Sequence, residues 1–261
     1  FDLELDQIWR FRGLLATLVH GDVMVMYRQA ALGATWAIIQ PIFAVAIFTI
    51  VFSRIAKLPV PGDTPYPIFA FAAVLPWTYF AEAVRRGSTG LVNESNLVRK
   101  VYFPRMIIPL SGVLAPLLDF TIAFFVLIAM MLLMGVTPTW RLAAAFPLVL
   151  VAGSMALAVS LWLAPINVRY RDVKYTMTFM LQIWMYASPV VYSSTMVPEK
   201  WKWVYALNPM VGVIEGFRWA VTGQGEPDMM ALGIGVSLII LLLFGGLLFF
   251  KRLERNFADL I

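Results

Sequence analysis

The chain has 261 residues, of which 61% are hydrophobic and 13% carry a charge, and its net charge is +5. A water-soluble domain of this length has roughly a quarter of its residues charged, so the composition excludes one. The chain contains no cysteine, which excludes disulfides and cysteine nucleophiles, and its single histidine argues against a structural zinc site. The basic residues lie between apolar runs, a pattern typical of membrane topology and not of nucleic-acid binding.

The first predicted element is an amphipathic helix over residues 5–24. Apolar residues alternate there with Arg10 and Arg12 at helical spacing, and the segment is too polar to span a membrane. The pattern favours a helix that lies on the cytoplasmic membrane surface. We therefore expect a cytoplasmic interface segment over residues 1–31 and a single transmembrane domain over residues 32–261.

Tyr27 and Arg28 precede the first long apolar run. Arginine can hold phosphate oxygens with two parallel hydrogen bonds, so the pair is a candidate contact for the phosphate of a lipid headgroup. The alternative is that Arg28 only anchors the helix at the cytoplasmic surface, as basic residues commonly do.

Six apolar runs have about the length that a bilayer-spanning helix needs. They cover roughly residues 33–53, 66–84, 106–134, 142–166, 176–192 and 229–250. Most of the 20 Lys and Arg residues lie in segments on the same side as the termini, so the positive-inside rule predicts an N-in, C-in topology. The predicted fold is an all-α integral membrane protein with six transmembrane helices.

Residues 93–105, NESNLVRKVYFPR, form a charged island between the second and third runs. Read as a helix, they place apolar side chains on one face and charged ones mostly on the other, with Asn93 or Ser95 as a cap and Pro104 as a stop. Such a cytoplasmic helix is either a docking element for a soluble partner or an ordinary loop helix on the membrane surface.

Asp119 lies near the middle of the third predicted span. A carboxylate there costs about 2.5–3.5 kcal/mol on insertion scales, so its side chain should face the protein interior or water. It is either a polar position in a pore or a carboxylate that a neighbouring helix satisfies. Glu82 has helical spacing to Arg85 and Arg86, which predicts local ion pairs near the membrane edge.

Residues 195–228 follow the fifth run and contain two apolar patches, separated by Asn208 and Pro209. Each patch is too short to cross the bilayer, so we expect a pair of re-entrant or surface helices on the outside, with their backbone buried in protein or lining a wet cavity. Glu215 and Arg218 again have the spacing of an ion pair on one helix.

Five segments, taken in order, resemble one family. They are MYRQAALGATWAIIQPIFAVAIFTIVFSRIAKL at 26–58, NESNLVRKVYFPRMIIPL at 93–110, NVRYRDV at 167–173, SPVVYSS at 188–194 and LNPMVGVIEGFRW at 207–219. They resemble the permease subunit of bacterial ABC exporters for lipid-linked polysaccharides, the O-antigen, capsule and teichoic acid exporters of the type-2 ABC permease class. The resemblance extends over nearly the whole chain, and the combination of segments carries it.

This resemblance implies a transport subunit, not an enzyme, in the bacterial inner membrane. It implies a homodimer that moves a polyprenyl-pyrophosphate-linked glycan, with membrane lipids around it and two copies of a separate ABC ATPase bound to it. The chain has no G-x-x-x-x-G-K-[ST] loop to hold nucleotide phosphates. We therefore expect no cofactor on this chain, and ATP and Mg²⁺ on the partner.

The resemblance also implies roles for single residues. The short helix between spans two and three would be the coupling helix, and the residues that dock in the ATPase would be Glu94, Leu97, Val98, Arg99 and Tyr102.

A channel at the dimer interface would be bordered by spans one and five. The candidates that line it are Trp184, Tyr186 and Tyr192, together with Asp119; the alternative for the aromatic residues is that they face lipid or pack internally. The external helix pair would be the periplasmic gate, with Asn208, Pro209, Glu215 and Arg218.

Three other functions are weighed against polysaccharide export. The main alternative is a permease of the same class that exports a smaller amphiphile, such as a drug or a lipid. A membrane enzyme on lipid-linked sugars needs a cluster of acidic or histidine side chains, whereas the 15 acidic residues here are scattered. An ion-coupled transporter should show several ionisable residues inside the membrane, where Asp119 stands nearly alone.

Overall fold

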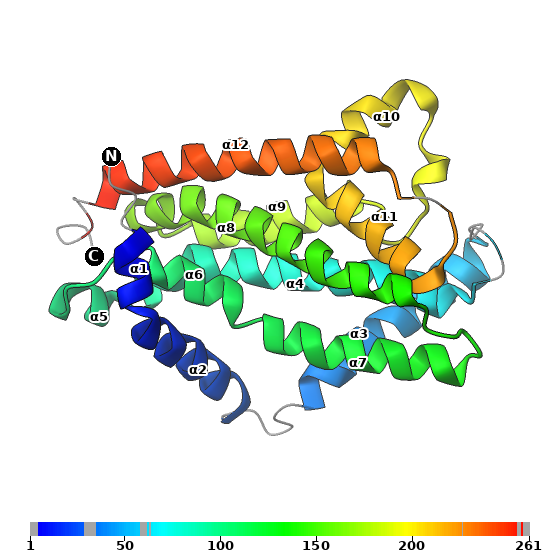
Figure 1. Ribbon diagram of the computed structural model, residues 1–261, viewed down its shortest axis with the longest axis horizontal. Helices are drawn as coiled ribbons and strands as arrows, with labels where there is room; N and C mark the ends of the chain where they lie inside the picture. The colour runs from blue at the N-terminus through cyan, green and yellow to red at the C-terminus, as the bar shows by residue number, and fades with distance from the viewer. Residues whose placement is uncertain are drawn as a thin grey trace.

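The computed structural model is a bundle whose longest helices run roughly parallel to one another (Figure 1). It describes residues 5–28, 35–57, 62, 64–225, 227–254 and 257. All regular secondary structure in these ranges is helical, which confirms the all-α part of the predicted fold class.

The N-terminal segment forms two helices, α1 (Leu5–Arg10) and α2 (Arg12–Arg28), where the sequence predicted one. The chain turns at Phe11 between them. Phe11, Leu14 and Leu18 pack against the buried cluster that joins the ends of the long helices, so the apolar face of the predicted amphipathic helix lies against protein.

The first predicted span consists of α3 (Trp36–Phe48) and a π-helical continuation, η2 (Thr49–Ile55). In η2 the backbone N–H groups bond to the fifth carbonyl back, as Ala56 N–H does to the Val51 oxygen at 2.9 Å. Pro41 lies inside α3, and the helix continues through it.

Helix α4 (Tyr66–Asn93) forms the centre of the bundle, and most of its residues are buried. Its 28 residues extend over about 42 Å, which is longer than a hydrocarbon core of about 30 Å. The predicted span ended at residue 84, because the charges that follow indicated a membrane edge. The helix runs nine residues further, since those charged side chains pair with one another on its surface.

The third predicted span is divided. After α5 (Ser95–Lys100) come α6 (Ile107–Leu114) and α7 (Leu117–Leu133), with a break at Pro116. Figure 1 shows α7 displaced sideways from α6. A side chain at Gly112 would lie 2.7 Å from the backbone nitrogen of Gly87, so glycine at this position lets α6 and α4 pack backbone to backbone.

The other long helices are α8 (Ala145–Arg169), which follows η3 (Trp140–Ala144), and α12 (Met229–Glu254). Helix α8 packs between α4 and α12. These helices agree with the predicted fourth and sixth spans, and α8 extends a few residues further at its end.

The fifth predicted span is the one that the structure does not bear out. Helix α9 (Val173–Tyr186) has 14 residues and is about 21 Å long, too short to cross a hydrocarbon core of about 30 Å. Proline at position 189 disfavours helix in the residue before it, and the chain turns away after Tyr186. Among the described residues five helices are long and apolar enough to cross a membrane, so the predicted count of six is not confirmed.

The segment after α9 contains η4 (Ser194–Met196), α10 (Glu199–Ala206) and α11 (Pro209–Thr222). The two helices match the predicted pair, with Asn208 as the N-cap of the second. They differ in burial: α10 has no buried residue, whereas most of α11 is buried among α4, α8 and α12.

The bundle has two distinct ends (Figure 1). We call one the α5 end; it also holds α1 and the last turn of α12, and a buried cluster with Leu91, Val98 and Phe250 joins α4, α5 and α12 there. We call the other the α10 end; it holds α10, α11 and the turn before α8. The larger buried core lies between them, around α4.

Candidate functional site

The predicted gate residue Arg218 holds the segment after α9 in place. Its side chain is 4% exposed. One guanidinium nitrogen donates to the Tyr192 carbonyl at 2.9 Å and the other to the Val190 carbonyl at 3.0 Å. Glu215, one turn earlier on α11, forms an ion pair with Arg218 at 3.0 Å, as its spacing predicted.

The first turn of α4 encloses the same segment from the other side. The Tyr66 hydroxyl donates to the Val191 carbonyl at 3.0 Å. The guanidinium carbon of Arg218 lies 3.8 Å from the centre of the Phe69 ring, a cation–π contact. Residues 190–192 are therefore fastened between α4 and α11, in an arrangement that we call the α11 clamp.

Asn208 ties a predicted channel residue to the start of α11. Its side-chain oxygen accepts from the backbone N–H of Met210 at 3.1 Å and from the indole N–H of Trp184 at 2.9 Å. Its amide nitrogen donates to the Ser188 hydroxyl at 2.8 Å. The ring of Trp184 packs edge-on against Phe80, with centroids 5.1 Å apart. One side chain thus caps α11 and fixes the end of α9.

A chain of tyrosines completes the cluster. The Tyr205 hydroxyl of α10 donates to the Tyr192 hydroxyl at 2.9 Å, and the Tyr192 hydroxyl donates to the Tyr186 carbonyl at 3.2 Å. Burial, and then the hydrogen bond with Tyr192, raise the pKa of the Tyr205 phenol. Trp184 and Tyr192 are half-buried in this cluster, whereas the Tyr186 ring is exposed.

The structure therefore brings together two residue sets that the sequence kept apart. The predicted channel aromatics and the predicted gate residues lie in one connected group at the α10 end. Sequence reasoning missed Tyr66, Phe69 and Tyr205, which complete that group from α4 and α10. The available sequence signals were the paired aromatic residues at the start of α4 for Tyr66 and Phe69, and the run of aromatic residues on α10 for Tyr205.

The predicted coupling helix is shorter than expected. Helix α5 has six residues, its N-cap is Glu94, and no side chain caps it, so the predicted caps Asn93 and Ser95 do not act as caps. Val101 is already extended, which places Tyr102 beyond the helix.

The predicted docking residues differ in exposure. Tyr102 is 89% exposed and Arg99 is also exposed, whereas Glu94 and Leu97 are half-buried. Val98 is 5% exposed and belongs to the cluster at the α5 end. Val98 therefore anchors α5 to the bundle and does not present a docking surface, because its side chain is enclosed by the chain itself.

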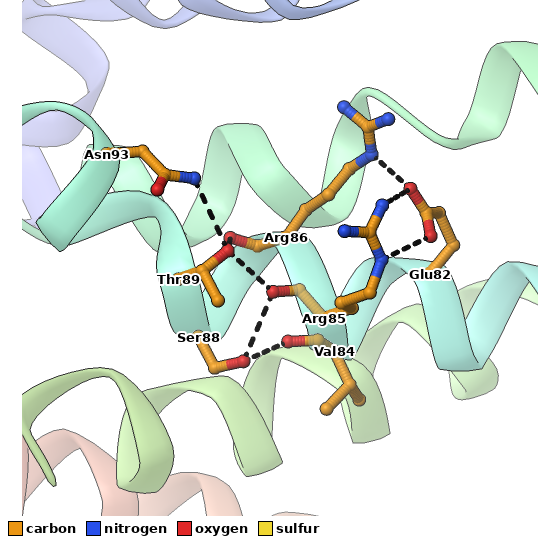
Figure 2. A network of polar contacts seen from close by, with 7 residues as sticks. All are labelled: Glu82, Val84, Arg85, Arg86, Ser88, Thr89 and Asn93. Carbon is orange, nitrogen blue, oxygen red and sulfur yellow. Dashed lines mark hydrogen bonds and ion pairs between the residues drawn. The ribbon is translucent and has the colours of Figure 1, made fainter. Parts of the chain in front are cut away.

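The charged group on α4 is shown in Figure 2. Glu82 accepts from Arg85 at 2.6 and 2.8 Å and from Arg86 at 2.5 Å, which confirms the predicted local pairing. Further along, the Thr89 hydroxyl donates to the Arg85 carbonyl at 2.9 Å, within the same helix. The charges are thus satisfied along α4, and the helix continues past them.

Asp22 of α2 is a charged residue that the sequence reasoning missed. Burial raises the pKa of its carboxyl, and the positive charge of Arg86 offsets only part of that rise. The available signal was its position four residues after Leu18, which places both on the face of α2 that packs inward. Asp22 therefore lies near enough to the charged group of α4 for the charge of Arg86 to act on its carboxyl.

Asp119 lies in the first turn of α7, directly after the break at Pro116, and not in the middle of a continuous helix. A carboxylate there complements the positive end of the helix dipole. The residue is half-buried and has an interaction partner, which favours the satisfied carboxylate over a bare pore position. The side chains of Tyr27 and Arg28 lie outside the described residues, so the headgroup prediction remains untested.

No set of three or more His, Cys, Asp or Glu side chains is placed to hold a metal ion in the described part of the chain. Most polar groups of the site instead bind one another, and the Arg218 Nε is the buried atom of the site without a hydrogen-bond partner in the described residues. The arrangement at the α10 end holds the segment after α9 in place. At the α5 end, Arg99 and Tyr102 are exposed.

Five apolar helices of spanning length, with short helices at both ends, define a multi-pass membrane protein. Residues 13–222 match the family model described as "ABC-2 type transporter". The chain belongs to the ABC-2 type transporter family, and it is a permease subunit of the bacterial inner membrane. Membership implies an ABC transporter system with an ATPase partner.

Curated relatives match along almost their whole length. An "O-antigen export system permease protein RfbA" of Myxococcus xanthus is 28% identical over 257 residues, 98% of each chain. Two proteins of the same name from Klebsiella pneumoniae are 25% and 24% identical over 249 residues, 95% of each chain. The expected resemblance to permeases of polysaccharide export is confirmed at the level of the family and these relatives.

Proposed function

We propose that this chain is the transmembrane permease of an ATP-driven exporter that moves a polyprenyl-pyrophosphate-linked polysaccharide, such as an O-antigen, across the inner membrane. The observation that carries the proposal is its similarity, over 98% of both chains, to a permease named for O-antigen export. A transport subunit of this kind performs no chemistry on its cargo, as the family of the chain implies.

The proposed topology keeps six crossings, with both termini in the cytoplasm. Helix α9 and the segment fastened by the α11 clamp would together make the fifth crossing, since α9 alone is too short. The α5 end would be cytoplasmic, which is supported by the basic last turn of α12. Residues 1–31 would form the interface segment and residues 32–261 the transmembrane domain.

Helix α5 is the proposed coupling element for a separate ATPase, with two copies bound to a homodimer. Val98 fastens it to the bundle, and exposed Arg99 and Tyr102, with half-buried Glu94 and Leu97, would contact the partner. Because α5 directly follows α4, a push on α5 would move the central helix of the bundle. ATP and Mg²⁺ would bind to the partner, and no cofactor to this chain.

The proposed channel lies between two copies of the chain, along α3 and α9. Both helices pack against α4 and keep apolar residues exposed, among them Phe43, Ile47, Phe179 and Ile183. A second copy would cover part of that surface. Tyr186 is the aromatic candidate whose ring is exposed to a passing sugar, and Tyr27 and Arg28 would meet the pyrophosphate at the channel entrance. Asp119 would border the channel at the start of α7.

The α11 clamp is the proposed gate at the periplasmic end. Asn208, Glu215 and Arg218 bind Ser188, Ser194 and Tyr192, and these bonds would keep the gate shut. Pro209 occupies the first turn of α11, where its missing N–H costs nothing. Opening would exchange these bonds for contacts with water or sugar hydroxyls.

The test is to delete the gene in its host and measure polyprenyl-linked glycans by mass spectrometry, with internal and surface pools separated. We expect long polymer on lipid pyrophosphate to accumulate inside and to vanish from the surface. Unchanged pools would refute the proposal and favour export of a smaller amphiphile, such as a drug or a lipid.

The coupling role is tested in the same strain. Glu94→Ala with Arg99→Ala should abolish surface polymer and weaken ATPase association, while the permease remains folded in membranes. The matched control is Glu199→Ala with Lys202→Ala, an exposed charge pair on α10 at the other end. Normal export by the α5 variant would exclude docking through these residues.

A further inference from the structure

A cavity of about 920 Å³ lies at the α5 end, on the side of the bundle formed by α8 and α12. The cavity is also lined by the segment that follows α5 and by Gln7 of α1. It belongs neither to the α11 clamp nor to the exposed apolar surface of α3 and α9. Its lining is half polar and half apolar, and the two kinds of residue come from different parts of the wall.

The polar part of the wall is mainly cationic. It contains Arg105, Lys251 and Arg252, with Glu254 as its one carboxylate among the lining residues. The Arg105 guanidinium donates to the Glu254 carbonyl and lies 5.8 Å from the centre of the Phe257 ring. The carbonyl and the ring are neutral and fix the guanidinium in position, while the Glu254 carboxylate accepts from the Arg105 backbone N–H at 3.2 Å. With three cations and one carboxylate, the wall keeps an excess of positive charge that an anion can meet.

The apolar part of the wall lies deeper along α8 and α12. The rings of Trp162 and Phe249 stack with centroids 4.9 Å apart, and Leu248 lies beside them. The Trp162 indole N–H donates to the Leu242 carbonyl at 3.0 Å, so its polar atom is satisfied and its ring offers only apolar contact. A side chain at Gly245 would come within 2.9 Å of the Trp162 ring, so glycine keeps that ring against α12.

The order of these parts matches a lipid molecule. Lys251 and Arg252 stand in the last turn of α12, directly after its long apolar run, where a helix reaches the headgroup level. Basic pockets between helices at that level bind anionic lipid headgroups. The cations alone would be enough to bind a free anion, so a free anion does not account for the apolar wall. A protein partner does not account for an apolar wall that continues toward the membrane core.

We propose that this cavity binds an anionic phospholipid of the membrane leaflet at the α5 end, with its phosphate at Arg105 and Arg252 and an acyl chain along Leu248, Phe249 and Trp162. The bound lipid bridges α12 and the segment that leads from α5 to α6. It therefore stiffens the connection between the proposed coupling helix and the bundle. The site is separate from the proposed path of the exported lipid.

The test uses the purified full-length chain in detergent, titrated with dioleoylphosphatidylglycerol or dioleoylphosphatidylcholine and observed by native mass spectrometry. We expect phosphatidylglycerol to be retained several-fold more strongly. Arg252→Gln should weaken its retention about fivefold, and the double variant with Arg105→Gln about twenty-five-fold, as two independent charge contacts would. Binding of phosphatidylcholine should stay unchanged.

The matched control is Arg169→Gln with Arg171→Gln, which removes two exposed cations at the same end of the bundle outside the cavity. This control should retain phosphatidylglycerol like the unmodified chain. Equal loss in the control would show general charge attraction and overturn the site. Arg252 is exposed, so the single variant tests the proposal even where the double variant unfolds.

The same titration on the chain with its ATPase bound separates a lipid from a protein occupant. Retention of phosphatidylglycerol in the complex supports the proposal. Displacement of the lipid by the ATPase, with weaker ATPase association of Arg252→Gln, would make the cavity a protein docking surface and overturn the lipid site.

Discussion

The two ends of the bundle handle charge in opposite ways. At the α10 end, Arg218 is 4% exposed, and its partners are Glu215 and two carbonyl groups of the same chain. At the α5 end, Tyr102 is 89% exposed, and Arg99 and Arg252 point outward. The α10 end therefore encloses the charge of Arg218 within the chain, whereas the α5 end leaves the charges of Arg99 and Arg252 exposed.

The same contrast separates two ion pairs of identical spacing at the α10 end. Glu215 and Arg218 are enclosed between α4 and α11, whereas Glu199 and Lys202 lie on exposed α10, at 2.6 Å from each other. A buried pair is costly to break because one uncompensated charge stays in a poorly solvated place. An exposed pair contributes little, since water replaces either partner. The distance between the charged atoms therefore does not show which of the two ion pairs contributes more to stability.

The largest expected effect comes from Arg218→Met, which keeps the volume and removes the charge. It leaves Glu215 without its ion-pair partner and the Val190 and Tyr192 carbonyls without donors, and should destabilise the folded chain by about 3–5 kcal/mol. Lys202→Met is the matched control and should cost less than about 0.5 kcal/mol. Thermal unfolding of both variants in detergent gives the comparison, and equal melting temperatures would mean that the clamp does not hold the α10 end.

Asn208→Ala should have the next largest effect. It removes the N-cap of α11 and leaves the Trp184 indole N–H without its acceptor, for about 2 kcal/mol in all. Asn208→Asp should recover most of that loss, because a carboxylate accepts both bonds and only the donations to Ser188 and to the Ala187 carbonyl disappear. Thermal unfolding and Trp fluorescence of the two variants measure this difference. Equal stability of Asn208→Ala and Asn208→Asp would contradict the capping role.

Much of the fold could be predicted from the sequence. Long apolar runs located five of the six expected spans, and the Asn208–Pro209 dipeptide located the boundary between α10 and α11, because both signals are local. The i,i+3 and i,i+4 spacings found the pairs of Glu82 and Glu215 for the same reason.

What failed depends on contacts between distant parts of the chain. The early end of α9 follows from the binding of its next residues to α11, and the break at Pro116 separates α6 from α7 inside one apolar run. Composition cannot distinguish a broken run from a continuous one. Val98 was predicted as a docking residue because helical periodicity places it on one face with other apolar residues. Periodicity does not show whether the rest of the protein covers that face, and in the structure Val98 is buried.

Tyr66→Phe should have a smaller effect, since it removes one hydrogen bond to the Val191 carbonyl and keeps the ring. The expected loss is about 1 kcal/mol, a few degrees of melting temperature. If the clamp is the gate, this variant should also open it more readily and raise the permeability of proteoliposomes to small sugars. The control is Tyr79→Phe, which also removes one hydrogen bond, from the Tyr79 hydroxyl to the Val113 carbonyl, at a place outside the clamp.

Tyr102→Ala should have the smallest effect on stability, because the side chain is almost fully exposed and the backbone there is already extended. Less than about 0.5 kcal/mol is expected, as for surface substitutions in general. Its effect should appear instead in ATPase association, where an exposed aromatic residue at a docking surface contributes about 2 kcal/mol, roughly a thirtyfold change in Kd. Pull-down of the ATPase with the purified variant measures this. A stable variant that binds the ATPase normally would show that the exposed α5 end meets its partner through other residues, and a variant that loses both stability and binding would remove the distinction between the two ends.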